Sequence, residues 1–321
     1  MIYYAVLCAL LTTPLILKIY LKLRTKWCRS PKCLIGKTTI ITGANTGIGF
    51  ETALNFAKRG ARVILACRDP KKAETARQKI ISESENQNIF VKIVDFASFE
   101  SIRGFAKSVH ETENRLDILV NNAAVACEGT QKTHDGFYLG MQVNYLSLFL
   151  LTNLLLDLMS KSGPGRIVNV SSIMAKTALF FNPDNLRSYY GDVDMYSRTK
   201  LCIILFTQQL ARKLQNTQIT TYSLHPGAVK TEIFRHLTGF NLLVSAIIKF
   251  FFAKTPGEGA QTNIYCSVER NIEKFSGQHF EECRKVATYP NARDASVGER
   301  LWRVSEELVK LKEEEKFQFG A

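Results

Sequence analysis

The chain has 321 residues, of which 46% are hydrophobic and 22% charged, the proportions of an ordinary globular protein with one large α/β domain or two smaller ones. The formal net charge is +13, and much of the positive surplus lies before Glu51, the first acidic residue. The rest of the chain shows no basic patch interleaved with aromatic residues, which argues against a nucleic-acid partner. The 8 cysteines include no Cys-x-x-Cys pair, so neither a disulfide framework nor a metal site is expected.

The first segment, residues 1–23, is predicted to be a membrane anchor. Residues 2–17 carry no charge, and extension to Leu23 gives about 33 Å of helix, against a hydrocarbon core of about 30 Å. Basic residues follow this apolar run instead of preceding it as in a secretory signal, which places the rest of the chain on the cytosolic side. The alternative is a buried N-terminal core helix. The basic linker that follows, residues 24–37, is expected to lie beside lipid phosphate.

From residue 38 onward, short β-rich runs alternate with helical patterns. The runs are almost continuously apolar, which suits strands covered on both faces. They are residues 38–42, 62–66, 90–94, 117–121, 166–170 and 219–224. Between them lie helices such as 98–113, in which apolar residues recur at three- and four-residue spacing. This alternation predicts one α/β domain, residues 38–321, built on a Rossmann-type doubly wound parallel sheet. The acidic run near the C-terminus is expected to be a solvated face of a last helix.

The turn after the first strand, "TGANTGIG", contains Gly43, Gly47 and Gly49. Glycine permits a tight turn, a close approach of the backbone to a pyrophosphate, and close packing of the next helix on the strand. The N–H groups at the start of that helix, near Ile48, favour an anion. The spacing is Gly-x-x-x-Gly-x-Gly and not Gly-x-Gly-x-x-Gly, so it is the position between the first strand and first helix that predicts a dinucleotide site.

The second strand ends in Cys67 and Arg68, where an NAD-binding chain would carry an acid for the ribose hydroxyls. A basic residue at this place can bind the additional phosphate of NADP. Asp69 comes one position too late to replace the acid. The alternative is a surface arginine at a strand end, but the missing acid favours NADP.

Four polar residues predict the chemistry. Tyr196 and Lys200 stand four apart in "YSRTK" and so share one helix face, where the ammonium should lower the pKa of the phenol from about 10 toward the working range. Ser172 follows the strand in "RIVNVSS", where a hydroxyl can orient a substrate oxygen at the carboxyl end of the sheet. Asn144 lies among apolar neighbours, which predicts a buried amide with a specific role.

In this order the motifs resemble those of the short-chain dehydrogenases/reductases and, within that family, of the membrane-anchored retinol dehydrogenase branch. The resemblance covers about residues 36–310 and rests on "TGANTGIG", "ARVILACRD", "NNAA", "VNYLSLFLLT", "RIVNVSS", "YSRTK", "HPGAVKTE" and "EGAQT". It implies an NADP(H)-dependent oxidoreductase that interconverts an apolar alcohol and its aldehyde or ketone. Retinol and retinal are the leading pair, with isoprenoid, fatty and sterol substrates as alternatives. A catalytically silent membrane or lipid-droplet binding protein is the alternative of another class.

The resemblance also implies a role for each site residue. Tyr196 would be the general acid or base, Ser172 would polarise the carbonyl, and Asn144 would support a water chain that relays the proton. Lys200 would lower the pKa of the tyrosine and hold the nicotinamide ribose, and Arg68 would meet the 2′-phosphate. The remaining expected cofactor contacts come from turns after the strands: Gly43, Asn45, Thr46, Gly47, Ile48, Gly49, Asp95, Asn122, Pro226, Gly227 and Thr231.

Some features depart from the family's usual pattern. Ala124 replaces the usual glycine of the Asn-Asn-Ala-Gly turn, which puts the cofactor affinity in question. The spacing between Ser172 and Tyr196 is wider than in most of the family. The apolar segment 240–252 occupies the family's variable substrate region, and it is expected either to cover the substrate pocket and dip into the membrane or to be a core helix. The resemblance further suggests the endoplasmic reticulum as the membrane, and it is compatible with a homo-oligomer.

Overall fold

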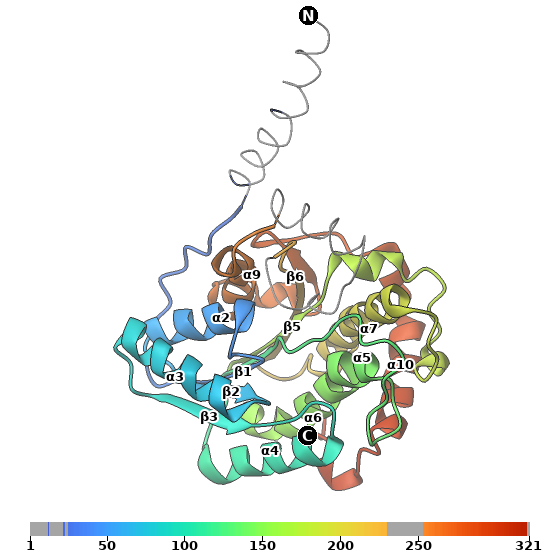
Figure 1. Ribbon diagram of the computed structural model, residues 1–321, viewed down its shortest axis with the longest axis horizontal. Coiled ribbons are helices and arrows are strands. Elements are labelled where there is room, and N and C mark those ends of the chain that lie inside the picture. Colours follow the sequence, from blue (N-terminus) through green and yellow to red (C-terminus); the bar gives the residue numbers. More distant parts are fainter. Residues whose placement is uncertain (1–11, 13–21, 23–24, 230–252, 320–321) are drawn as a thin grey trace, which may run out of the picture.

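A single sheet of eight strands forms the centre of the domain (Figure 1). The structure, a computed structural model, describes residues 12, 22, 25–229 and 253–319. The strand order is β3-β2-β1-β4-β5-β6-β7-β8, and all neighbours are parallel except β7 and β8. The strands are β1 Thr38–Thr42, β2 Arg62–Cys67, β3 Ile89–Ile93, β4 Ile118–Asn121, β5 Gly165–Val170, β6 Ile219–His225, β7 His279–Glu281 and β8 Arg284–Lys285. The predicted doubly wound sheet is therefore confirmed.

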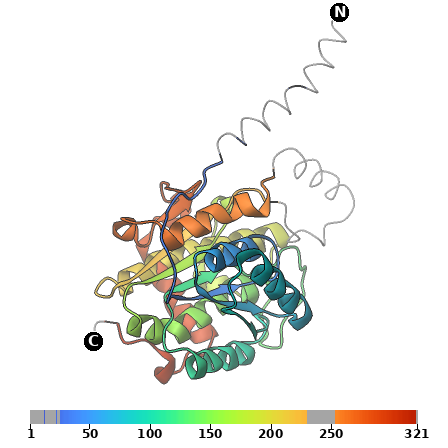
Figure 2. The same cartoon turned by 90° about the vertical axis from the view of Figure 1, so that its left-hand side faces the viewer.

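Helices cover both faces of the sheet, because successive strand residues point to opposite sides. Ile40 and Ile41 of β1 accordingly belong to different buried apolar clusters. Figures 1 and 2 show the two helical layers. One layer contains α2 (Gly47–Lys58), α3 (Pro70–Ser84) and α9 (Pro256–Val268); the other contains α4 (Phe99–Thr112), α5 (Leu139–Met141), α6 (Ser147–Lys161) and α7 (Asp192–Lys213), with α10 (Ala295–Leu308) packed on α7. Each fully buried aliphatic side chain contributes about 1.5–3 kcal/mol relative to an exposed one.

The C-terminal helix ends earlier than predicted. α10 stops at Leu308, because Lys310 takes a left-handed φ of 51° and Leu311 N–H bonds back to the Glu306 carbonyl at 3.0 Å. The acidic run beyond it is not only a solvated face: Glu315 accepts hydrogen bonds from Arg103 Nε at 2.6 Å and Nη2 at 2.9 Å. Glu313 and Glu314 are exposed as expected, but the expected helix was wrong for this segment, and a long-range ion pair that local sequence does not reveal holds Glu315 against α4.

One helical stretch of the described residues, Leu139–Lys161, is long and apolar enough to cross a membrane. Of its most apolar 18-residue window, 83% is buried within the domain, so it is a core helix. The predicted anchor, apart from residues 12 and 22, and the apolar segment 240–252 lie outside the described residues.

Candidate active site

The turn between β1 and α2 depends on its glycines. Gly43 and Gly47 have φ values of 65° and 59°, which side-chain-bearing residues rarely adopt. A Cβ on Gly49 would lie 2.4 Å from the Gly43 carbonyl oxygen and 2.6 Å from Asn122 Nδ2. α2 begins with no acidic residue in its first turn and no side-chain cap, so its first N–H groups can bind an anion.

Gly49→Ala tests this close approach. The new methyl group meets backbone atoms that cannot rotate away, so we expect the turn to shift, the NADPH dissociation constant to rise at least about tenfold, and the melting temperature to fall. Titration of NADPH fluorescence and a thermal melt measure both effects. Gly104→Ala in α4 is the matched control, because a Cβ there meets nothing within 4 Å and alanine stabilises a helix interior by about 0.5–1 kcal/mol. Unchanged cofactor affinity in Gly49→Ala would contradict the interpretation of this turn.

Two asparagines hold the backbone at the carboxyl end of the sheet. Asn122 follows β4, and its Nδ2 donates to the Thr42 carbonyl at 2.9 Å. Asn144 lies in a π-helical turn, Gln142–Leu146, and is 1% exposed. Its Oδ1 accepts from Val125 N at 2.8 Å while its Nδ2 donates to Val125 O at 2.9 Å. Both side chains therefore position loops at the carboxyl end of the sheet. The π-helical turn that carries Asn144 is of a kind frequent at functional sites.

Ser172, Tyr196 and Lys200 come together where β5 ends. Ser172 caps a short 3₁₀ helix, Ile173–Thr177, and is hydrogen-bonded to Tyr196. Tyr196 and Lys200 lie on one face of α7, with Lys200 Nζ 5.4 Å from the centre of the tyrosine ring. Lys200 Nζ also donates to the Val170 carbonyl at 3.0 Å. The structure thus joins a hydroxyl, a phenol and an amine from two elements distant in the chain.

Burial determines the ionisation of this group. It raises the pKa of Tyr196 to about 12, and the hydrogen bond from Ser172 offsets only part of that effect. Burial also lowers the pKa of Lys200 to about 7. The pKa of the phenol therefore shifts in the direction opposite to the one predicted from the neighbouring lysine, because burial is the largest influence on it.

One cavity of about 480 Å³ connects these elements. The predicted site residues that line it are Gly43, Asn45, Thr46, Ile48, Arg68, Asp95, Asn122, Ser172, Tyr196, Lys200, Pro226 and Gly227. Gly47, Gly49 and Asn144 do not line it, and Thr231 lies outside the described residues. Ala124, the departure from the usual glycine, also lines the cavity and does not have a positive φ, so its backbone does not require glycine.

The rim of the cavity beyond β2 is basic. Arg68 is exposed there and has no hydrogen bond or ion pair with any described residue. Asp69, which also lines the cavity, caps α3: its Oδ1 accepts from Lys71 N at 2.9 Å and from Lys72 N at 3.1 Å. Lys72 lines the same cavity, and sequence reasoning missed it. It stands in the first turn of α3, four residues after Arg68, and no motif spacing signals it.

His225, at the end of β6, is a second residue that sequence reasoning missed. It lines the cavity, and its buried Nδ1 has no hydrogen-bond partner among the described residues. Burial lowers its pKa to about 4 and lowers that of neighbouring His279 to about 3. His279 is held neutral between Ser223 Oγ at 2.9 Å and the Tyr289 hydroxyl at 3.2 Å.

These histidines predict acid sensitivity. In the unfolded chain both histidines become protonated below about pH 6.5, whereas in the folded protein they stay neutral to a lower pH. Their contribution to stability is therefore present above pH 6.5 and is lost as the pH falls toward 4. We expect the free energy of unfolding to fall by up to about 1.4 kcal/mol per pH unit for each histidine in this window. Urea unfolding between pH 7 and pH 4 measures the slope, which should decrease in His279→Gln but not in the exposed-residue control His134→Gln. A slope unchanged in His279→Gln would contradict this origin.

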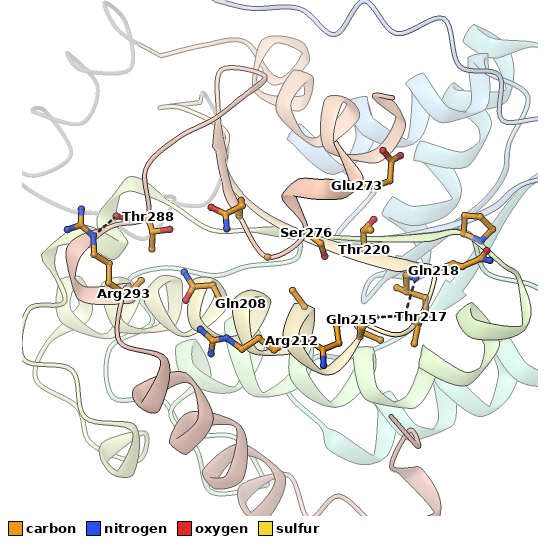
Figure 3. A pocket seen from close by; sticks show the side chains of 17 residues that line it. Gln208, Arg212, Gln215, Thr217, Gln218, Thr220, Glu273, Ser276, Thr288 and Arg293 are labelled. Carbon is orange, nitrogen blue, oxygen red and sulfur yellow. Dashed lines mark hydrogen bonds between the residues drawn. The ribbon is translucent and has the colours of Figure 1, made fainter. Parts of the chain in front are cut away.

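A second cavity, of about 850 Å³, lies between the C-terminal half of α7, the start of β6 and residues 288–293 (Figure 3). Its labelled lining is polar, and none of the predicted site residues contributes to it. It is larger than the first cavity but lacks the hydroxyl, phenol and amine group. Chemistry and not volume therefore selects the first cavity as the candidate active site.

Comparison with known proteins shows the family of the chain. Residues 37–240 match the family model of the short chain dehydrogenases. The chain belongs to the short-chain dehydrogenase family. Retinol dehydrogenase 11 of Homo sapiens is 43% identical over 285 residues, 88% of this chain and 89% of that protein. Retinol dehydrogenase 13 of Mus musculus is 44% identical over 291 residues, 88% of this chain and 87% of that protein. The predicted retinol dehydrogenase-like branch is confirmed.

Solved structures share the fold. An uncharacterized protein from Mycobacterium paratuberculosis has a TM-score of 0.71 and 29% identity, covering 89% of this chain and 98% of that one. A short chain dehydrogenase from Escherichia coli complexed with NADPH has a TM-score of 0.61 and 24% identity, covering 78% of this chain and 99% of that one, a likeness of fold alone. This short-chain dehydrogenase is accordingly an oxidoreductase that uses a nicotinamide cofactor.

Proposed function

We propose that this short-chain dehydrogenase is an NADP(H)-dependent enzyme that interconverts an apolar alcohol and its aldehyde or ketone, with retinol and retinal as the leading pair. The observation that carries the proposal is the hydrogen-bonded Ser172 and Tyr196 beside Lys200, in a cavity that extends to Arg68. The names of relatives that are 43% and 44% identical support a retinoid substrate. Val125, Val143, Ile173 and Met174 add apolar lining to that cavity.

Proton transfer falls to Tyr196. The nicotinamide ring, when bound, supplies or accepts the hydride. With a pKa of about 12, the phenol is protonated at neutral pH and can donate its proton to the oxygen of a carbonyl substrate, which Ser172 Oγ orients. In the opposite direction the phenol must first lose its proton, and a charged Lys200 favours that loss. Asn144 holds the Val125 backbone beside the reacting group and would support the water chain that relays the proton.

The cavity fits a phosphorylated dinucleotide. Gly49 leaves no room for a Cβ, so Gly43, Asn45, Thr46, Gly47 and Ile48 can form a close backbone cradle for phosphate. Arg68 and Lys72 would hold the 2′-phosphate of NADP, since the carboxylate of Asp69 is engaged in capping α3. Further proposed contacts are Asp95 near the adenine, Asn122 along the adenosine half, Tyr196 and Lys200 at the nicotinamide ribose, and Pro226, Gly227 and Thr231 near the nicotinamide.

We further propose that residues 1–23 anchor the enzyme in a membrane, that of the endoplasmic reticulum, with residues 38–321 on the cytosolic side. The order of apolar and basic residues supports this topology. Of the basic linker, residues 25–30 would then lie next to the headgroups, whereas Leu34 is buried in the domain and Lys37 pairs with Asp117.

The test uses the purified full chain in lipid nanodiscs with NADPH and a panel of carbonyls: retinal, a fatty aldehyde, an isoprenoid aldehyde and a sterol ketone. Loss of the absorbance of the reduced nicotinamide reports turnover, and NADH in place of NADPH tests cofactor choice. We expect turnover with NADPH and fastest turnover with retinal. NADPH binding without turnover of any carbonyl would instead support the silent binding protein.

A further inference from the structure

The segment between β5 and the first turn of α7 exposes large apolar side chains. The rim patch consists of Ile173 (43% exposed), Leu179 (70%), Phe180 (100%), Tyr190 (67%) and Val193 (65%). Isolated exposed apolar residues are ordinary, but a group from one segment marks an interaction surface. This segment is also the one that makes the spacing between Ser172 and Tyr196 wide.

The rim patch belongs to a well-held part of the fold. Asn291 Nδ2 donates to the Ala175 carbonyl at 2.7 Å and to the Ala178 carbonyl at 3.0 Å, while Ala178 is itself buried. Leu179 and Phe180 therefore point outward from an anchored backbone.

The rim patch also borders the catalytic cavity. Ile173 lines the cavity next to Ser172. Thr177 Oγ1 lies 2.8 Å from Ser197 Oγ, which in turn donates to the Val193 carbonyl at 2.7 Å, so the 3₁₀ helix and the first turn of α7 form one surface. The rim patch thus adjoins the cavity through Ile173, on the side of Ser172.

The basic linker is held along α9. Lys22 Nζ lies 2.5 Å from Glu258 Oε1 in the first turn of α9, Cys28 N donates to Gln261 Oε1 at 3.1 Å, and Ser30 Oγ donates to the carbonyl of Val268, the last residue of α9, at 3.1 Å. We call residues 25–30 the strap. Because its own hydrogen bonds reach from Gln261 to Val268 of α9, and Lys22 just before it pairs with Glu258, the strap is not a free tether (Figures 1 and 2).

The strap enters the domain at the end where the cavity lies. Gly259 of α9 is close to Val229 and Ile48, since a Cβ on it would meet Val229 Cγ2 at 2.6 Å and Ile48 Cγ1 at 3.2 Å. Both of those residues line the cavity. In Figure 1 the strap lies at the upper left of the domain, and the segment that follows β5 runs from the upper right down the right-hand side. Trp27 of the strap is 56% exposed between exposed Lys26 and Arg29, an aromatic and basic combination typical of a membrane–water interface.

We propose that the rim patch and Trp27 contact the bilayer, so that the mouth of the catalytic cavity opens onto lipid. Apolar side chains of the rim patch enter the interfacial layer, and Lys26 and Arg29 meet anionic headgroups. The lipid contact itself does not rest on the proposed function. Only the passage of an apolar substrate through it does. An apolar alcohol or aldehyde would then pass between lipid and cavity without crossing water.

Fluorescence tests the contact without requiring activity. The chain has 2 tryptophans, and Trp302 is buried at 3% exposure, so a tryptophan at an exposed position reports its own surroundings. We would place Phe180→Trp in a Trp27→Phe background and reconstitute the full chain in phosphatidylcholine vesicles that contain phosphatidylserine and lipid brominated near the headgroup. Ile35→Trp is the matched control, because Ile35 is 76% exposed but precedes the amino end of β1, at the opposite edge of the sheet.

We expect the brominated lipid to quench the fluorescence of Phe180→Trp and of wild-type Trp27, and to leave that of Ile35→Trp nearly unchanged. Absence of quenching in Phe180→Trp would overturn the proposal and would indicate that a second copy of this chain or other residues of the same chain cover the rim patch. If turnover is found, the double substitution Leu179→Ser and Phe180→Ser should raise the apparent KM for vesicle-borne retinal severalfold and leave kcat unchanged. An unaltered KM would show that the rim patch does not serve substrate entry. Failure of the proposed function alone would remove turnover but leave the quenching intact.

Discussion

Tyr196→Phe is expected to reduce turnover by at least about 10²–10⁴-fold, the usual contribution of a positioned acid or base. The ring still fills its place on α7, but the hydroxyl that bonds to Ser172 and transfers the proton is lost. Cofactor binding should stay close to that of the wild type, because the phosphate cradle and Arg68 are untouched. Steady-state loss of NADPH absorbance measures turnover, and NADPH fluorescence measures binding.

Tyr222→Phe provides the control for removing a tyrosine hydroxyl from the interior. The Tyr222 hydroxyl donates to the Ile272 carbonyl at 3.2 Å, away from the catalytic cavity. Its loss should cost about 0.5–1.5 kcal/mol of stability and little turnover. If Tyr196→Phe retains more than a few per cent of activity, Tyr196 is not the proton donor and the mechanism proposed here is wrong.

Arg68→Ala should raise the dissociation constant of NADPH about 10–100-fold, because a charge-assisted hydrogen bond to a phosphate is worth about 1.5–3 kcal/mol. NADH lacks that phosphate, so its dissociation constant should not change. Lys72→Ala should act in the same direction with a smaller effect, since lysine binds phosphate as a point charge and not as a bidentate fork. Titrations of both cofactors against each variant measure the selectivity.

Arg212→Ala is the matched control, because Arg212 is an exposed arginine on α7 whose Nη1 bonds only locally, to Gln209 Oε1 at 2.9 Å. It should leave both dissociation constants unchanged. Equal weakening of NADPH and NADH in Arg68→Ala, or no weakening of either, would show that Arg68 is an ordinary surface residue at a strand end.

Much of the sheet could be predicted from the sequence because strands covered on both faces are continuous apolar runs. Each of the predicted strands lies within one residue of the observed bounds, from β1 at Thr38–Thr42 to β6 at Ile219–His225. The β7–β8 hairpin was not predicted, since strands of three and two residues carry no periodicity of their own. β7 pairs with β6, a strand more than 50 residues earlier in the chain, and local sequence does not reveal such a long-range pairing.

Much of the candidate site was also accessible from the sequence, because parallel strands direct their following turns to a single edge. Residues as far apart as Gly43 and Gly227 could be placed together on that ground, and both line one cavity. Lys72 and His225 were missed because neither stands in a motif whose spacing announces a ligand. They matter because the folded chain places both in the lining of the cavity.

The sequence by itself determined the order of strands and helices, the glycines of the first turn, and the residues that meet at the carboxyl edge, since these follow from local periodicity and from the geometry of parallel sheets. Only the tertiary structure decided the ionisation of Tyr196 and Lys200, because desolvation depends on all the surrounding elements and not on the two residues alone. It likewise decided that Asp69 caps a helix, that Glu315 pairs with Arg103, and that the basic linker is held along α9. Each of these is an interaction whose geometry exists only after the chain has folded.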